Sequence, residues 1–225
     1  MDLREAAIRN NVTWCATVAG APGTIDDANG FWLLDTAPPP LFPDLVTLRP
    51  GVAPDDVAQA LTGRDRCSVK DSFADVDMTA HGFAVAFEAQ WIGRAPRSSG
   101  SVSRGWFVAR DAEQLASWNR ASGLPSPLPD HLLDDAGTAV VVFGSADRIT
   151  AGAVVTRGAD VAGLSNVFDH GDQVTTSTWR DLLAVADLLC PGLPVVDYEH
   201  GVDLATALAA GLRTTGPLRV WVRPH

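Results

Sequence analysis

The 225-residue chain has few of the residues on which several protein classes depend. Its three cysteines form no CxxC pair and no Cys/His cluster with zinc spacing, so we expect neither a disulfide scaffold nor a structural zinc site. No stretch approaches the roughly 18 consecutive apolar residues of a membrane span. The first residues, Met1–Glu5, lack the basic and then apolar layout of a signal peptide. These absences predict a cytoplasmic protein without a metal site or a membrane span, in which Cys15, Cys67 and Cys190 pack as small hydrophobic residues.

Basic residues are also scarce. The chain has 17 Lys and Arg against 27 Asp and Glu, which gives a formal net charge of −10. Such a field repels the phosphates of nucleic acids and of anionic lipids, so we expect neither as a partner. The hydrophobic content of 46% is high enough to fill a core, and it excludes disorder as a description of the whole chain.

Two residue types occur only once, because Lys70 is the only lysine and Tyr198 the only tyrosine. Lys70 and Asp71 end a predicted strand, where a lysine beside apolar side chains can lose its proton and a carboxylate can orient one. Tyr198 and Glu199 directly follow an apolar strand, and ligands of open α/β sheets collect at such strand ends. We take these four residues as candidate catalytic groups. The alternative is structural: a surface lysine with a turn cap, and a capping cluster for the next helix.

Periodicity and turn residues predict alternating helices and strands, and therefore the α/β (α+β) class. The predicted helices are 3–19, 54–61, 111–121, 129–135, 178–189 and 202–210. The predicted strands are 30–35, 45–48, 67–73, 82–92, 106–109, 138–143, 149–156, 161–168, 193–198 and 218–222. Two of these strands, 67–73 and 82–92, resemble a hairpin under a helix. Residues 94–105 are rich in Ser, Gly and Arg, so we expect a linker there between an N-terminal unit (1–93) and a C-terminal domain (106–225).

The order of elements in 106–223 resembles the GCN5-related N-acetyltransferase (GNAT) superfamily. The closest local match runs from Asp203 through Gly211-Leu212 to Trp221, which looks like the penultimate helix, its terminal glycine and the last strand. The resemblance implies a mixed central sheet flanked by helices, and 1–93 could be a shortened second unit of the same kind. It also implies that the backbone of the central strand at Ser165, Asn166 and Val167 pairs with the pantetheine arm of acetyl-CoA or another acyl-CoA.

The sequence departs from this superfamily where the cofactor would bind. Typical members have Gln/Arg-x-x-Gly-x-Gly/Ala before the helix, and those glycines let backbone amides approach the pyrophosphate. Here the segment 169–176 retains one glycine, lacks arginine and carries Asp169 and Asp172. Each carboxylate–phosphate pair at 4–6 Å costs on the order of 1–4 kcal/mol, so the binding of acyl-CoA is opposed. The tyrosine that many members use as a general acid is replaced by Ala207.

Four further residues are candidate ligands of a small polar or zwitterionic substrate. Asp169 and His170 follow the central strand and should neighbour the end of strand 193–198. Asn11 and Trp14 share a helical face, with core packing as the alternative for Trp14.

Three functions remain open from the sequence. The first is a GNAT-like N-acyltransferase that acts on a small amine or biosynthetic intermediate. The second is a CoA-independent enzyme on the same scaffold. The third is a non-catalytic binding or partner subunit of a homo- or hetero-oligomer.

Overall fold

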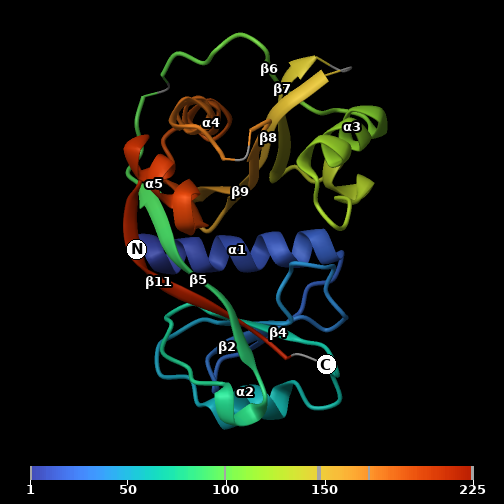
Figure 1. Cartoon of the computed structure of the whole chain (residues 1–225), viewed down its shortest axis with the longest axis vertical. Coiled ribbons are helices and arrows are strands. Elements are labelled where there is room, and N and C mark those ends of the chain that lie inside the picture. Colours follow the sequence, from blue (N-terminus) through green and yellow to red (C-terminus); the bar gives the residue numbers. More distant parts are fainter. Residues whose placement is uncertain (1, 99, 146–147, 172, 224–225) are drawn as a thin grey trace. The chain divides into compact units, whose positions relative to one another are not determined.

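The computed structural model describes residues 2–98, 100–145, 148–171 and 173–223. The chain forms two compact units (Figure 1). The C-terminal unit comprises Met1–Asn10 and Trp91–Thr215, and the N-terminal unit comprises Asn11–Gln90 and Gly216–His225. Three elements contribute residues to both units: α1 (Leu3–Ala19), β5 (Ala84–Arg94) and β11 (Arg213–Val222). The predicted linker 94–105 therefore lies inside the C-terminal unit, just after the division at 90/91.

The C-terminal unit has the element order that the sequence predicted. After β5 come β6 (Trp106–Val108), α3 (Ala112–Ser122), η2 (Asp130–Leu133), β7 (Thr138–Ser145), β8 (Arg148–Gly158), β9 (Val161–Asp169), α4 (Thr176–Leu189), β10 (Val195–Glu199) and α5 (Gly201–Ala209). Its strands lie in the order β5-β10-β9-β8-β7-β6. Strands β6 to β9 pair antiparallel and β9 pairs parallel with β10, so the sheet is mixed. Helices α3 and α4 cover opposite faces of β8 and β9 (Figure 1).

The long helix over this sheet is defined by its cap and by its apolar face. The Thr175 hydroxyl accepts from the Thr178 N–H, which satisfies one of the free amides at the start of α4. Trp179, Leu182 and Ala186 recur at helical spacing and are fully buried against the sheet. Burial of a side chain such as Leu182 stabilises the fold by about 1.5–3 kcal/mol.

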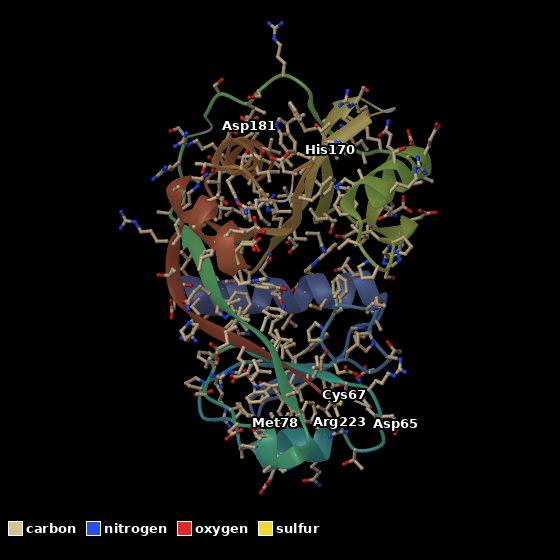
Figure 2. The ribbon with its side chains drawn as sticks, in the orientation of Figure 1. Asp65, Cys67, Met78, His170, Asp181 and Arg223 are labelled. Carbon is tan, nitrogen blue, oxygen red and sulfur yellow. The ribbon has the colours of Figure 1, made fainter. Side chains whose placement is uncertain are left out.

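Residues after β5 are tied to the outer face of α4. The side chains of Arg94 and Asp187 form a buried ion pair at 2.7 Å. Further along, Ser103 Oγ and Trp106 Nε1 donate to the carboxylate of Asp181, which is labelled in Figure 2. Between these two anchors the backbone has no helix or strand, and its described side chains are mostly exposed.

The strands of the N-terminal unit also include parallel and antiparallel pairs. They are β1 (Thr24–Asp26), β2 (Phe31–Leu33), β3 (Leu45–Thr47), β4 (Ser68–Asp71), β11 and β5, in that order within an 11-stranded sheet. Its helices are α2 (Pro54–Ala60) and the 3₁₀ helix η1 (Thr79–His81). Figure 2 labels Cys67 and Met78, which belong to its apolar core, and Arg223, whose N–H donates to the Cys67 carbonyl.

Two expectations for this unit are wrong. Strands β4 and β5 do not form a hairpin, because β11 from the end of the chain lies between them. The sequence of 82–92 also predicts alternation, with Phe83, Val85, Phe87 and Ala89 on one face. This fails, because residues 84–86 are all exposed and 91–94 are all buried, so burial changes along the strand and not between its faces. Strand β1 was not predicted at all.

The exposed segment after Arg94 yields a test of the predicted linker. Trypsin should cut first after Arg97 or Arg104, because both are exposed and lie outside helices and strands. Mass spectrometry of a limited digest identifies the first cut, and the double variant Arg97→Gln/Arg104→Gln should lose it. Initial cleavage within 149–198 instead would contradict this accessibility.

Candidate functional site

Strands β9 and β10 separate before either of them ends. They pair in parallel only at Ala162 with Val195 and at Gly163 with Val196. Beyond these pairs β9 continues to Asp169 and β10 to Glu199. Glycine is required at the last pair, because a Cβ on Gly163 would meet the Thr156 Oγ1 at 2.7 Å. Strands β9 and β10 are thus neighbours in the sheet, and beyond Gly163 and Val196 their facing backbones are not used in a ladder.

A β-bulge accompanies this separation. On the β8 side of β9, Gly152 pairs with Phe168 and Val154 with Ser165, so Asn166 and Val167 both oppose Ala153. Asn166 has φ +53°, a left-handed conformation that asparagine tolerates better than most residues. Its buried Oδ1 has no hydrogen-bond partner among the described residues. The three predicted cofactor residues therefore occupy, or adjoin, the point where β9 bends.

Across the separation lie Tyr198 and Glu199, at the end of β10. Alternation puts their side chains on opposite faces of the strand. The Tyr198 ring meets the Trp91 ring edge-on, with 5.5 Å between centroids. Glu199 instead lies near Asp203, in the first turn of α5. Burial, and then the negative charge of Asp203, raise the pKa of Glu199 to about 8, so this carboxyl group holds a proton at neutral pH.

The loop from β9 to α4 is held by the chain's own carboxylates. One oxygen of Asp169, Oδ2, accepts from the Thr175 N–H at 3.4 Å, from the Thr175 hydroxyl at 3.2 Å and from the Thr178 hydroxyl. The other, Oδ1, accepts from the His170 N–H at 2.8 Å. Asp203 Oδ1 accepts from the Val174 N–H at 3.0 Å. His170 itself is exposed, and Asp172 lies outside the described residues.

These contacts allow a test of whether acyl-CoA fits. The separated backbones of β9 and β10 and the bulge at Asn166 suit an amide-rich pantetheine arm, which needs backbone partners. At the start of α4 the residues do not suit a pyrophosphate, because the Val174 and Thr175 amides already donate to carboxylates. The residues present therefore fit the pantetheine arm of acyl-CoA and do not fit its pyrophosphate.

The remaining candidate residues belong to the core of the N-terminal unit. Lys70 is 4% exposed, and its Nζ donates to Asn11 Oδ1 at 2.8 Å, so the expectation of a surface lysine is wrong. Asp71 is fully buried and accepts from the Phe73 and Val76 amides, while burial raises its pKa. Trp14 packs on Phe42.

Sequence reasoning missed Asp203 as a site residue. Its signal was its place in the first turn of a helix that follows the Tyr198–Glu199 strand end, where a carboxylate is favoured by the helix dipole. Ala207, the replacement of the expected tyrosine, is fully buried in the core and supplies no proton. Within the described residues no group of three His, Cys, Asp or Glu side chains could hold a metal ion. No described helix is both long and apolar enough to cross a bilayer, and all three cysteines are buried and unpaired.

Comparison with known proteins identifies solved structures that share this fold. No family model and no curated protein matches the sequence. A solved GCN5-related N-acetyltransferase from Kribbella flavida is 15% identical, with a TM-score of 0.68 over 100% of this chain and 97% of that one. A conserved protein of unknown function from Staphylococcus epidermidis is 9% identical, with a TM-score of 0.66 over 91% and 94% of the two chains. A protein assigned to the GNAT acetyltransferases from Novosphingobium aromaticivorans is 13% identical, with a TM-score of 0.60 over 96% and 97%. At these identities the likeness shows the fold, and the predicted GNAT-like fold is confirmed.

The left-handed conformation of Asn166 predicts a specific pattern of stability. Asn166→Gly should change the melting temperature little, whereas Asn166→Val should lower stability by about 1–3 kcal/mol, because a β-branched residue is strained at positive φ. Ser165→Val, one residue earlier and without positive φ, is the matched control. Circular dichroism melts measure all three. Equal effects of the two valine variants would contradict the assigned bulge.

The raised pKa of Glu199 predicts how stability varies with pH. The folded state holds this proton up to about pH 8, whereas the unfolded chain releases it near 4.5. The contribution is therefore present below pH 4.5 and is lost as pH rises through 8. Relative to wild type, Glu199→Gln should gain stability between pH 5 and 8.5, by up to a few kcal/mol. Thermal melts across this range test it, with the exposed Glu113→Gln as control. A difference that does not vary with pH would disprove the raised pKa.

Proposed function

We propose that the protein is an N-acyltransferase that moves an acyl group from a thioester to the amine of a small polar acceptor. The observation that carries this proposal is the separation of β9 and β10 beyond Gly163 and Val196, with the bulge at Asn166. The separation leaves facing backbone groups of β9 and β10 outside a ladder, where an extended, amide-containing arm can pair with them. The Tyr198 N–H is already used, because it donates to Asp197 Oδ1 at 2.7 Å. The GNAT fold of the chain supports the same general activity.

The reaction requires two proton movements, and the end of β10 offers a group for them. The amine forms a C–N bond to the acyl carbon while the C–S bond breaks. The nitrogen must lose one proton and the departing sulfur must gain one. Glu199 lies three residues beyond the last β10 pair and Asn166 three beyond the last β9 pair, so both follow the point where the two strands separate. A carboxyl with a pKa of about 8 exchanges protons readily at neutral pH.

Tyr198 is the second candidate, from the other face of β10. Its phenol can donate a hydrogen bond, and its contact with Trp91 fixes the ring. The carboxylates of Asp169 and Asp203 favour an acceptor that carries a positive charge, in line with a small polar or zwitterionic amine. We place such an acceptor among biosynthetic intermediates.

A second candidate function is a reaction independent of CoA on the same scaffold. The specific observation in its favour is the pair of carboxylates bonded to the Val174 and Thr175 amides. An assay of thioester cleavage distinguishes the two, because a CoA-independent enzyme of another class releases no thiol from any acyl thioester.

The test is acyl transfer by the full chain. Purified protein is incubated with acetyl-CoA or S-acetylpantetheine and a panel of small amines, and thiol release and amide formation are measured. We expect Glu199→Gln to lower kcat at least tenfold and to remove a pH-dependent limb near 8, and Tyr198→Phe to lower kcat by a similar factor. Glu113→Gln, on the exposed start of α3, should be unaffected. Absence of transfer from either donor to any amine would overturn the proposal.

A further inference from the structure

The start of α4 already carries an anion, and that anion is the side chain of Asp169. Its carboxylate accepts four hydrogen bonds, from the His170 and Thr175 amides and from the Thr175 and Thr178 hydroxyls. Backbone and hydroxyl donors at the start of a helix are the groups that hold a phosphate in proteins. Here they converge on a residue of the same chain.

The neighbouring amide, that of Val174, also donates its hydrogen bond to a carboxylate of the same chain. The Val174 N–H donates to Asp203, which also lies beside Glu199. A pyrophosphate at this loop would have to displace two carboxylates from two successive amides. Once displaced, both would remain close by, because Asp169 ends β9 and Asp203 is fixed in the first turn of α5. The incoming phosphates would then meet negative charge in place of donors.

No described residue offers a compensating cation at these contacts. Among the described residues, the Asp169 and Asp203 carboxylates accept hydrogen bonds from amides and hydroxyls, and the segment Asp169–Thr175 contains no Lys or Arg. The one basic side chain in the segment, His170, is exposed and contributes its backbone amide. The hydrogen-bond donors of the loop are therefore already paired with carboxylates of the chain. The loop also lacks the positive charge that a phosphate-rich ligand needs.

We infer that Asp169 makes this protein selective for an acyl donor with a pantetheine-like thioester arm and no pyrophosphate. The inference rests on the proposed acyl transfer and names its donor class. The separated ends of β9 and β10 take the arm, and the carboxylates at α4 exclude the nucleotide end of CoA. Such a donor is either a free acyl-pantetheine or a pantetheine arm carried on another molecule through a single phosphate.

The first experiment isolates the loop from catalysis and uses inorganic pyrophosphate as the probe. Calorimetry of the full chain should show no binding by wild type at millimolar pyrophosphate. Asp169→Asn and Asp169→Ala should both bind it, at least tenfold more tightly than wild type. Asp181→Asn, which removes the same charge from the outer face of α4, is the matched control and should behave as wild type.

Two results of this first experiment would overturn the inference. If wild type binds pyrophosphate at micromolar concentration, the anion displaces the Asp169 carboxylate from its hydrogen-bond donors easily. Folded Asp169 variants that still fail to bind would show that the carboxylate is not what excludes the anion. Asp169→Asn guards against unfolding, because its amide oxygen can retain the cap while the charge is lost. A melting temperature within a few degrees of wild type verifies the fold.

The second experiment compares donors. Wild type should use S-acetylpantetheine with a kcat/KM at least tenfold above its kcat/KM for acetyl-CoA, and Asp169→Asn should shift this ratio at least tenfold toward acetyl-CoA. An acetylated phosphopantetheine arm on a carrier protein, offered as a third donor, distinguishes the free source from the carried one. A wild-type kcat/KM for acetyl-CoA that equals or exceeds the value for S-acetylpantetheine would overturn the inference. Failure of every donor would instead refute acyl transfer, while the pyrophosphate result would still report on Asp169.

Discussion

The site depends on the point at which β9 and β10 stop pairing. Parallel strands that continued together would bond every facing amide and carbonyl, and nothing could enter between them. Here the ladder ends at Gly163 and Val196, and β9 carries one extra residue at Asn166–Val167, three residues further on. Asn166 and Asp169 on β9, and Glu199 on β10, therefore all lie beyond the last pair.

The carboxylates around this opening serve stability and selectivity through the same bonds. Asp169 caps the start of α4 and Asp203 holds the adjacent amide, so each satisfies donors that would otherwise need water. The negative charge of Asp203 and the burial of Glu199 keep the Glu199 carboxyl protonated. A second ionised group so close would add repulsion in a partly buried place. The raised pKa of Glu199 thus follows first from its burial and second from the charge of Asp203, the carboxylate that also holds the loop.

The sequence was sufficient for the local features of the fold. Caps at Asp111 and Thr175, and the element order from β6 to β11, follow from turn residues and periodicity. It was insufficient for contacts between distant segments. That β11 lies between β4 and β5 depends on a pairing of residues about 150 positions apart, which no local pattern encodes. For the same reason Lys70, expected on a surface, lies buried against Asn11, and Asp203 was overlooked beside Glu199.

Helix α5 has alanine at position 207 and no tyrosine, so in the proposed reaction the groups that exchange protons lie on β10. Position 207 is alanine and is packed in the core, so no polar side chain of that turn can reach the opening. The chain has one tyrosine, at 198, and four glutamates, of which Glu199 has its pKa raised to about 8. Both stand on adjacent positions of a strand that is rigidly held by β9 at its start. A strand end fixes a side chain as firmly as a helix does, and alternation aims these two at opposite faces. The proposed site therefore has two groups that can exchange protons, Tyr198 and Glu199, on opposite faces of β10. A tyrosine at position 207 would instead supply this group from α5.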